Sequence, residues 1–181
     1  MRLLKLLGGS FRSGSWVVAA LLSPAALWAQ STTVSTQYLM TLYAPLGPTQ
    51  EVDPSLEVNE VRPGGWVKGP RINGTLLAPA GDWSRVLPSG VARLDVRATI
   101  RTDDGALIYI SYNGIFKDSA ETEARAARGE VLTAKDMYFV IAPTLQTSAK
   151  KYDWLNAVQC IGKMVSYKND SYVKYDIFVV H

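Results

Sequence analysis

The residues of this chain that could do chemistry are carboxylates, tyrosines and basic side chains, because histidine is almost absent. The single histidine is His181, at the end of the sequence. Without an internal histidine, Ser-His-Asp and Cys-His arrangements lack their general base, and the common imidazole metal ligands are missing. Cys160 is the only cysteine, and its apolar surroundings favour an inert buried thiol. We therefore expect neither an intrachain disulfide nor a metal site.

The most suggestive pair of charged residues is Asp95 and Arg97. They lie two apart within residues 91–102, where apolar and polar residues alternate strictly. A strand of this period places both side chains on one face, where the arginine could tune the carboxylate for acid or base chemistry. The same spacing also describes an ion pair on a solvated outer face, and the pattern alone favours that reading.

Two other motifs are better explained by local structure than by ligand binding. The sequence Asp103-Asp104-Gly105 follows the most regular strand and is typical of a tight hairpin, so we interpret it as a turn rather than a cation site. Gly64 and Gly65 precede a strand without a helix to follow, unlike a phosphate-binding loop. The sequence therefore indicates no cofactor.

Residues 1–29 have the pattern of a secretory signal peptide. Three basic residues precede an apolar run over residues 16–22, and a small-residue site ends at Ala29. This run is shorter than the roughly 20 residues that span a bilayer. We expect cleavage after Ala29, a periplasmic or secreted protein, and no membrane association once the signal is removed.

Residues 30–181 have the length of one ordinary domain with a sizeable core. The whole chain carries 19 Lys and Arg against 16 Asp and Glu. Three of the basic residues and none of the acidic ones precede residue 30, which leaves 16 against 16. This balance does not suggest the clustered basic face that a nucleic-acid partner requires.

The exported part is expected to consist of strands joined by short turns. Strands are predicted at residues 37–44, 71–78, 91–102, 106–115, 137–142, 156–165 and 172–180, with a loop containing one short edge strand at 48–65. Residues 118–130 predict one short exposed helix, which is either a lid or a solvated connection. About eight strands with hairpin-length connections favour an all-β fold, a single antiparallel barrel.

Three runs of sequence together resemble the family known as domain of unknown function 3237, or UPF0311. They are GGWVKGPRINGTLLAPAGDW, GVARLDVRATIRTDDGALIYISYNG, and YFVIAPTLQT with the later YDWLNAVQCIG. The resemblance extends from about residue 37 to residue 180. It implies a calycin-like or lipocalin-like barrel and, for some relatives, cofactor-independent chemistry on oxygenated aromatic or polyketide-like molecules.

The resemblance also strengthens the hypothesis that the Asp95 face lines the barrel interior. In that case Asp95 is the acid or base, Arg97 orients it or pairs with an anionic oxygen, and Tyr109 donates a hydrogen bond to developing charge. Ligand contacts are then expected from six residues on the matching segments: Arg71, Trp83, Asn113, Tyr138, Trp154 and Asn156. The two tryptophans could equally close the barrel ends.

Two positions depart from the family pattern, because Val140 and Gln146 stand where the family usually has an arginine and a glutamate. Two hypotheses remain open. One is an exported lyase, isomerase or cyclase without a cofactor, acting on a small, partly aromatic molecule. The other is a non-catalytic carrier of a small hydrophobic ligand, which the two neutral replacements favour slightly.

Overall fold

The computed structural model describes residues 33–181. The expected signal peptide, residues 1–29, lies outside the described residues. Within the described part of the chain, no helix combines the length and apolar character needed to cross a membrane.

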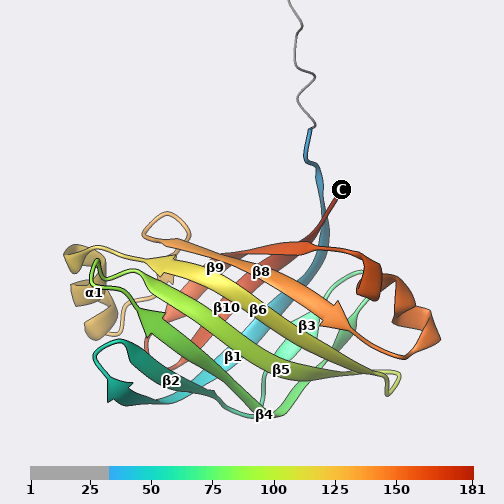
Figure 1. The fold of residues 1–181 in the computed structure, drawn as a ribbon, viewed down its shortest axis with the longest axis horizontal. Coiled ribbons are helices and arrows are strands. Elements are labelled where there is room, and N and C mark those ends of the chain that lie inside the picture. The colour runs from blue at the N-terminus through green and yellow to red at the C-terminus, as the bar shows by residue number, and fades with distance from the viewer. Residues whose placement is uncertain (1–32) are drawn as a thin grey trace, which may run out of the picture. The chain divides into compact units, whose positions relative to one another are not determined.

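Eight antiparallel strands form a closed ring (Figure 1). In ring order they are β1 (Thr36–Asp53), β2 (Leu56–Val61), β4 (Asn73–Val86), β5 (Ala92–Thr102), β6 (Leu107–Lys117), β8 (Tyr138–Gln146), β9 (Cys160–Lys168) and β10 (Tyr172–Val180). Strand β10 pairs with both β9 and β1, which closes the ring. The predicted all-β barrel is confirmed.

Two short strands complete the ten strands of the described residues. Strand β3 (Trp66–Lys68) lies between β1 and β4, and β7 (Leu132–Thr133) pairs with β9. The expected loop at residues 48–65 is instead largely a hairpin, because β1 continues to Asp53 and pairs with β2. Since β2 also pairs with β4, it belongs to the barrel wall and is not an edge strand.

The described residues also form two short helices, which lie at opposite ends of the barrel (Figure 1). Helix α1 (Ala120–Ala127) falls within the predicted helical segment, whereas the 3₁₀ helix η1 (Lys150–Ala157) was not expected. Figure 1 shows α1 at one end and η1, in dark orange, at the other. The prediction that a strand begins at residue 156 is wrong, because η1 occupies that position and β9 begins at Cys160.

The alternation of the strands decides which side chains fill the barrel. On β5, Leu94, Val96, Ala98 and Ile100 are buried, while the polar residues between them are more exposed. A barrel wall has period two, and its interior takes the apolar face because burial of one such side chain stabilises by about 1.5–3 kcal/mol. Toward the η1 end the interior is packed with fully buried residues such as Val67, Ile72, Ile100, Ile108 and Leu155.

Candidate functional site

The half of the barrel interior away from η1 contains a cavity of about 170 Å³. Its wall combines five aromatic residues and three carboxylates with aliphatic side chains. The aromatic residues are Tyr112, Phe116, Phe139, Tyr167 and Tyr175, and the carboxylates are Glu57, Asp82 and Asp170. An apolar cavity of about 150 Å³ is large enough for benzene, so this space suits a ligand with one ring.

Asp82 is the most deeply buried carboxylate of this wall, at 9% exposure. It lies on β4 in the same inward-facing set as Leu76 and Ser84. The Ser84 hydroxyl donates to Oδ2 at 2.6 Å, and the backbone N–H of Asp95 donates to Oδ1 at 2.9 Å. Burial raises the pKa of Asp82, and these two hydrogen bonds offset part of the rise. Asp82 can therefore hold a proton at a higher pH than an exposed aspartate.

Two buried phenols, Tyr112 on β6 and Tyr175 on β10, face the same cavity. Their rings meet edge to face, with 6.1 Å between centroids. Burial raises the pKa of both well above the usual value for tyrosine, so both hydroxyls stay protonated. Neither hydroxyl is hydrogen-bonded to another described residue, although both side chains line the cavity. A ligand can accept their hydrogen bonds.

An aromatic cluster forms one wall of the cavity around Phe139. Its ring lies 4.9 Å from that of Phe116 and 5.2 Å from that of Tyr175, in each case edge to face. Tyr167 extends the cluster, and its hydroxyl donates to Asn169 at 2.7 Å. Burial raises the pKa of Tyr167 to about 12. This wall offers a ligand ring several aromatic edges and faces.

Asp95 and Arg97 lie on the outer face of β5, not in the interior. Their side chains form an ion pair at 2.9 Å and are 42% and 51% exposed, respectively. The Arg97 guanidinium lies 5.5 Å from the ring centroid of Trp83, which is 41% exposed. The hypothesis that this face lines the barrel is wrong in geometry, because Leu94 and Val96 take the inward positions. A catalytic role for the pair stays a prediction without support from the cavity.

Three further candidate residues, Tyr109, Asn113 and Tyr138, also face outward. Tyr109 is 38% exposed and lines an outer groove that also includes Asn156. Tyr138 is 55% exposed and shares a second outer groove with Asn113. The Asn113 amide donates to the Leu94 carbonyl at 3.1 Å, which ties β6 to β5. These residues lie on the outer wall, apart from the cavity.

The remaining candidates lie at the η1 end. The guanidinium of Arg71 stacks over the ring of Trp154 at 3.7 Å, and Trp154 packs partly buried against the core. This position agrees with the alternative that Trp154 closes a barrel end. Asn156 accepts a hydrogen bond from the Thr147 backbone N–H and donates to the Thr147 carbonyl, both at 2.9 Å, which holds η1 against the end of β8. None of the nine candidate residues lines the interior cavity.

Sequence reasoning therefore missed Asp82, Tyr112 and Tyr175, three of the polar residues that line the cavity. For Asp82 a signal was present, because it stands beside Trp83 in the family pattern and two positions before Ser84 in the inward-facing set. Tyr112 and Tyr175 each continue an alternating row of buried apolar residues on β6 and β10. That pattern indicates burial, but it does not show that a side chain faces a cavity.

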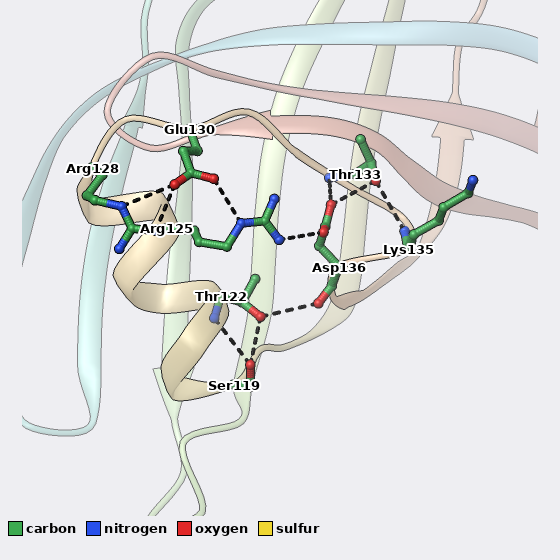
Figure 2. Close-up of polar contacts among 8 residues, drawn as sticks. All are labelled: Ser119, Thr122, Arg125, Arg128, Glu130, Thr133, Lys135 and Asp136. Carbon is green, nitrogen blue, oxygen red and sulfur yellow. Dashed lines mark hydrogen bonds and ion pairs between the residues drawn. The ribbon is translucent and has the colours of Figure 1, made fainter.

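The α1 segment connects β6 to β8 at the cavity end, between the cavity-lining residues Phe116 and Phe139. Figure 2 shows how it is held. Arg125 donates to Glu130 at 2.9 Å and to Asp136 at 2.7 Å. Asp136 also accepts from the Thr133 backbone N–H at 2.7 Å, and its contacts with Arg125 and Thr133 lower its pKa to about 2. No residue from 118 to 138 lines the cavity, so the lid interpretation stays a prediction.

A closed ring of eight strands around a partly polar interior cavity defines the class of this protein, a small antiparallel β-barrel. The family model described as Protein of unknown function (DUF3237) matches residues 34–180. The chain belongs to this family, which confirms the resemblance seen in the sequence.

Named relatives agree with this assignment. UPF0311 protein RPA1785 of Rhodopseudomonas palustris is 31% identical over 133 residues, which cover 72% of this chain and 87% of the relative. Its crystal structure, of a conserved protein of unknown function, matches 83% of this chain and 99% of its own with a TM-score of 0.76 at 27% identity. A β-barrel-like protein of Acinetobacter baumannii matches 84% and 99% with a TM-score of 0.70 at 28% identity.

A more distant structure shares the fold alone. It is described as an enzyme from Penicillium herquei, and it covers 86% of this chain and 100% of its own. The TM-score is 0.61 and the identity is 21%.

Proposed function

We propose that this barrel binds one small, ring-sized molecule in its interior cavity. The observation that carries the proposal is the convergence of a buried carboxyl group, Asp82, and two buried phenols, Tyr112 and Tyr175, on one largely apolar space. Buried polar groups need hydrogen-bond partners, and a few such groups within an apolar wall are typical of small-molecule sites. Asp82 already accepts two hydrogen bonds, so a ligand with a polar substituent on one ring would chiefly bind the two phenol hydroxyls.

The test replaces each cavity phenol with phenylalanine. Because neither hydroxyl bonds to a described residue, Tyr112→Phe and Tyr175→Phe should change the free energy of unfolding by less than about 0.5 kcal/mol. Each should weaken binding of ring compounds about five- to tenfold, since a ligand hydrogen bond contributes about 1 kcal/mol. Binding is measured by ligand-observed NMR on a panel of single-ring compounds.

The matched control is Tyr109→Phe, the same substitution on the outer face. It should leave the affinity unchanged. If Tyr109→Phe weakens binding while the two cavity variants do not, the ligand lies on the outer wall and the proposal fails.

A second candidate function is cofactor-independent catalysis by proton transfer. It is favoured by the raised pKa of Asp82, since an acid or base works best when its pKa approaches the working pH. Asp82 would move the proton, and Tyr112 and Tyr175 would donate hydrogen bonds to developing negative charge. The fold shared with the Penicillium herquei enzyme supports this candidate only by analogy. Once a bound compound is known, mass spectrometry separates the two functions. A product that forms with the wild type and not with Asp82→Asn indicates an enzyme. Binding of the compound without any product indicates a carrier.

We also propose that the protein is exported, on the signal-peptide pattern of residues 1–29. Expression of the full chain in a bacterial host should give a periplasmic or secreted product beginning at Gln30. Intact-mass measurement on each cell fraction tests this. Full-length protein confined to the cytoplasm would contradict it.

A further inference from the structure

The charged groups that line the cavity all have the same sign. Glu57, Asp82 and Asp170 contribute carboxylates, and no Lys, Arg or His among the described residues lines this space. The sequence from residue 30 onward carries equal numbers of basic and acidic residues, so composition alone does not produce an all-acidic lining. Glu57 lies close enough to Asp82 for its charge to raise the Asp82 pKa. An anionic ligand would meet repulsion here without any compensating cation.

The rest of the lining also suits a positive charge. Five aromatic residues line the space. The face of an aromatic ring carries the negative part of the ring quadrupole, which attracts cations within about 6 Å. The hydroxyls of Tyr112 and Tyr175 belong to side chains that are 6% and 1% exposed, and neither is hydrogen-bonded to a described residue. Their oxygen atoms can accept a hydrogen bond from a cationic donor as well as donate one.

We propose that the cavity selects a small organic cation, a protonated amine that carries a single ring. The inference rests on the proposed function of the cavity and names its ligand class. The ammonium group binds Asp82 and Glu57, and the ring packs against the wall formed by Phe116, Phe139 and Tyr175. The pairing compensates for the burial of the Asp82 charge, which has no cationic partner among the described cavity residues.

The test compares three probes that share one ring and one carbon substituent and differ in charge. Benzylamine is cationic near neutral pH, benzyl alcohol is neutral and benzoate is anionic. Isothermal titration calorimetry with the purified protein, at low salt, gives the three dissociation constants. We expect benzylamine to bind at least about tenfold tighter than benzyl alcohol, and benzoate to bind more weakly than either.

Variants locate the origin of the preference. The preference is expressed as the dissociation constant of benzyl alcohol divided by that of benzylamine. Asp82→Asn and Glu57→Gln should each reduce this ratio at least about fivefold. The control Asp103→Asn, in the exposed hairpin after β5, should leave it unchanged. The ratio cancels changes in cavity shape that affect both probes alike. If Asp82→Asn does not fold, Glu57→Gln still decides.

The outcomes separate the two proposals. If benzyl alcohol or benzoate binds as tightly as benzylamine, the cation inference is overturned and the cavity remains a small-molecule site. If no probe binds at millimolar concentration, the proposed function is overturned and the cation inference with it. A preference for benzylamine that both carboxylate variants retain places the cation elsewhere and also overturns the inference.

Discussion

Replacing Asp82 with asparagine should change how the stability of the free protein depends on pH, so that the variant gains stability relative to the wild type as the pH rises. Burial raises the pKa of Asp82 above the value of about 3.9 expected in the unfolded chain. Between these two pKa values the folded protein holds the proton more strongly than the unfolded chain does. The free energy of unfolding of the wild type therefore falls as the pH rises through this interval.

The size of the effect follows from the number of protons involved. A single proton changes the free energy of unfolding by at most about 1.4 kcal/mol per pH unit, and the change ends once the pH passes the folded-state pKa. Asparagine at this position cannot ionise. Its Oδ1 can still accept from the Asp95 backbone N–H, and the Ser84 hydroxyl can turn to accept from the new amide. The variant should gain stability relative to the wild type as the pH rises from about 4.

The assay is urea unfolding followed by tryptophan fluorescence between about pH 4 and pH 8. Asp103→Asn, an exposed carboxylate in the hairpin at the far end of β5, is the matched control and should follow the wild type. Ser84→Ala removes a hydrogen bond that lowers the Asp82 pKa, so it should extend the falling interval to higher pH. If the free energy of unfolding of Asp82→Asn minus that of the wild type stays constant or falls as the pH rises, the reasoning is refuted.

Three substitutions elsewhere test the packing that supports the cavity, each by chemical denaturation. Gly74→Ala should destabilise the protein by about 1–3 kcal/mol or more, because the new Cβ would lie 2.3 Å from the carbonyl oxygen of Arg101. Unchanged stability would contradict this close approach of β4 and β5. Leu155→Ala should lower the free energy of unfolding by about 2–5 kcal/mol, since the Leu155 side chain of η1 is fully buried. A loss below about 1 kcal/mol would show that η1 does not pack against the core. Ser119→Ala should lower the free energy of unfolding by about 1 kcal/mol, because the Ser119 hydroxyl caps α1 by accepting from the Thr122 N–H. A variant as stable as the wild type would contradict that cap.

The barrel could be predicted from the sequence because the alternation over β5 is strict and the turns are short. The 3₁₀ helix η1 could not, since it offers only one pair of buried residues, Tyr152 and Leu155, at the three-residue spacing of a single turn. The hairpin of β1 and β2 was also missed. Prolines and short apolar stretches made residues 48–65 resemble a loop, and pairing with β4 supplies the stability that local sequence does not show.

The site was harder to predict because alternation shows that two faces differ but does not identify cavity-lining residues. Asp95 and Arg97 stood out as a charged pair, yet their apolar neighbours Leu94 and Val96 are the ones that point inward. Tyr175 is fully buried, like the core residues beside it, and only the packing of all eight strands determines that it faces open space. The decisive information is the volume that the side chains leave unfilled, which no single segment contains.

The claim that the functional site is the interior cavity is tested most directly by a crystal structure of the protein with the tightest-binding of the three ring probes. We predict density for the probe inside the barrel, within hydrogen-bond distance of at least one of Asp82, Tyr112 and Tyr175. Density on the outer wall beside Trp83 and Arg97, with none inside the barrel, would contradict the account.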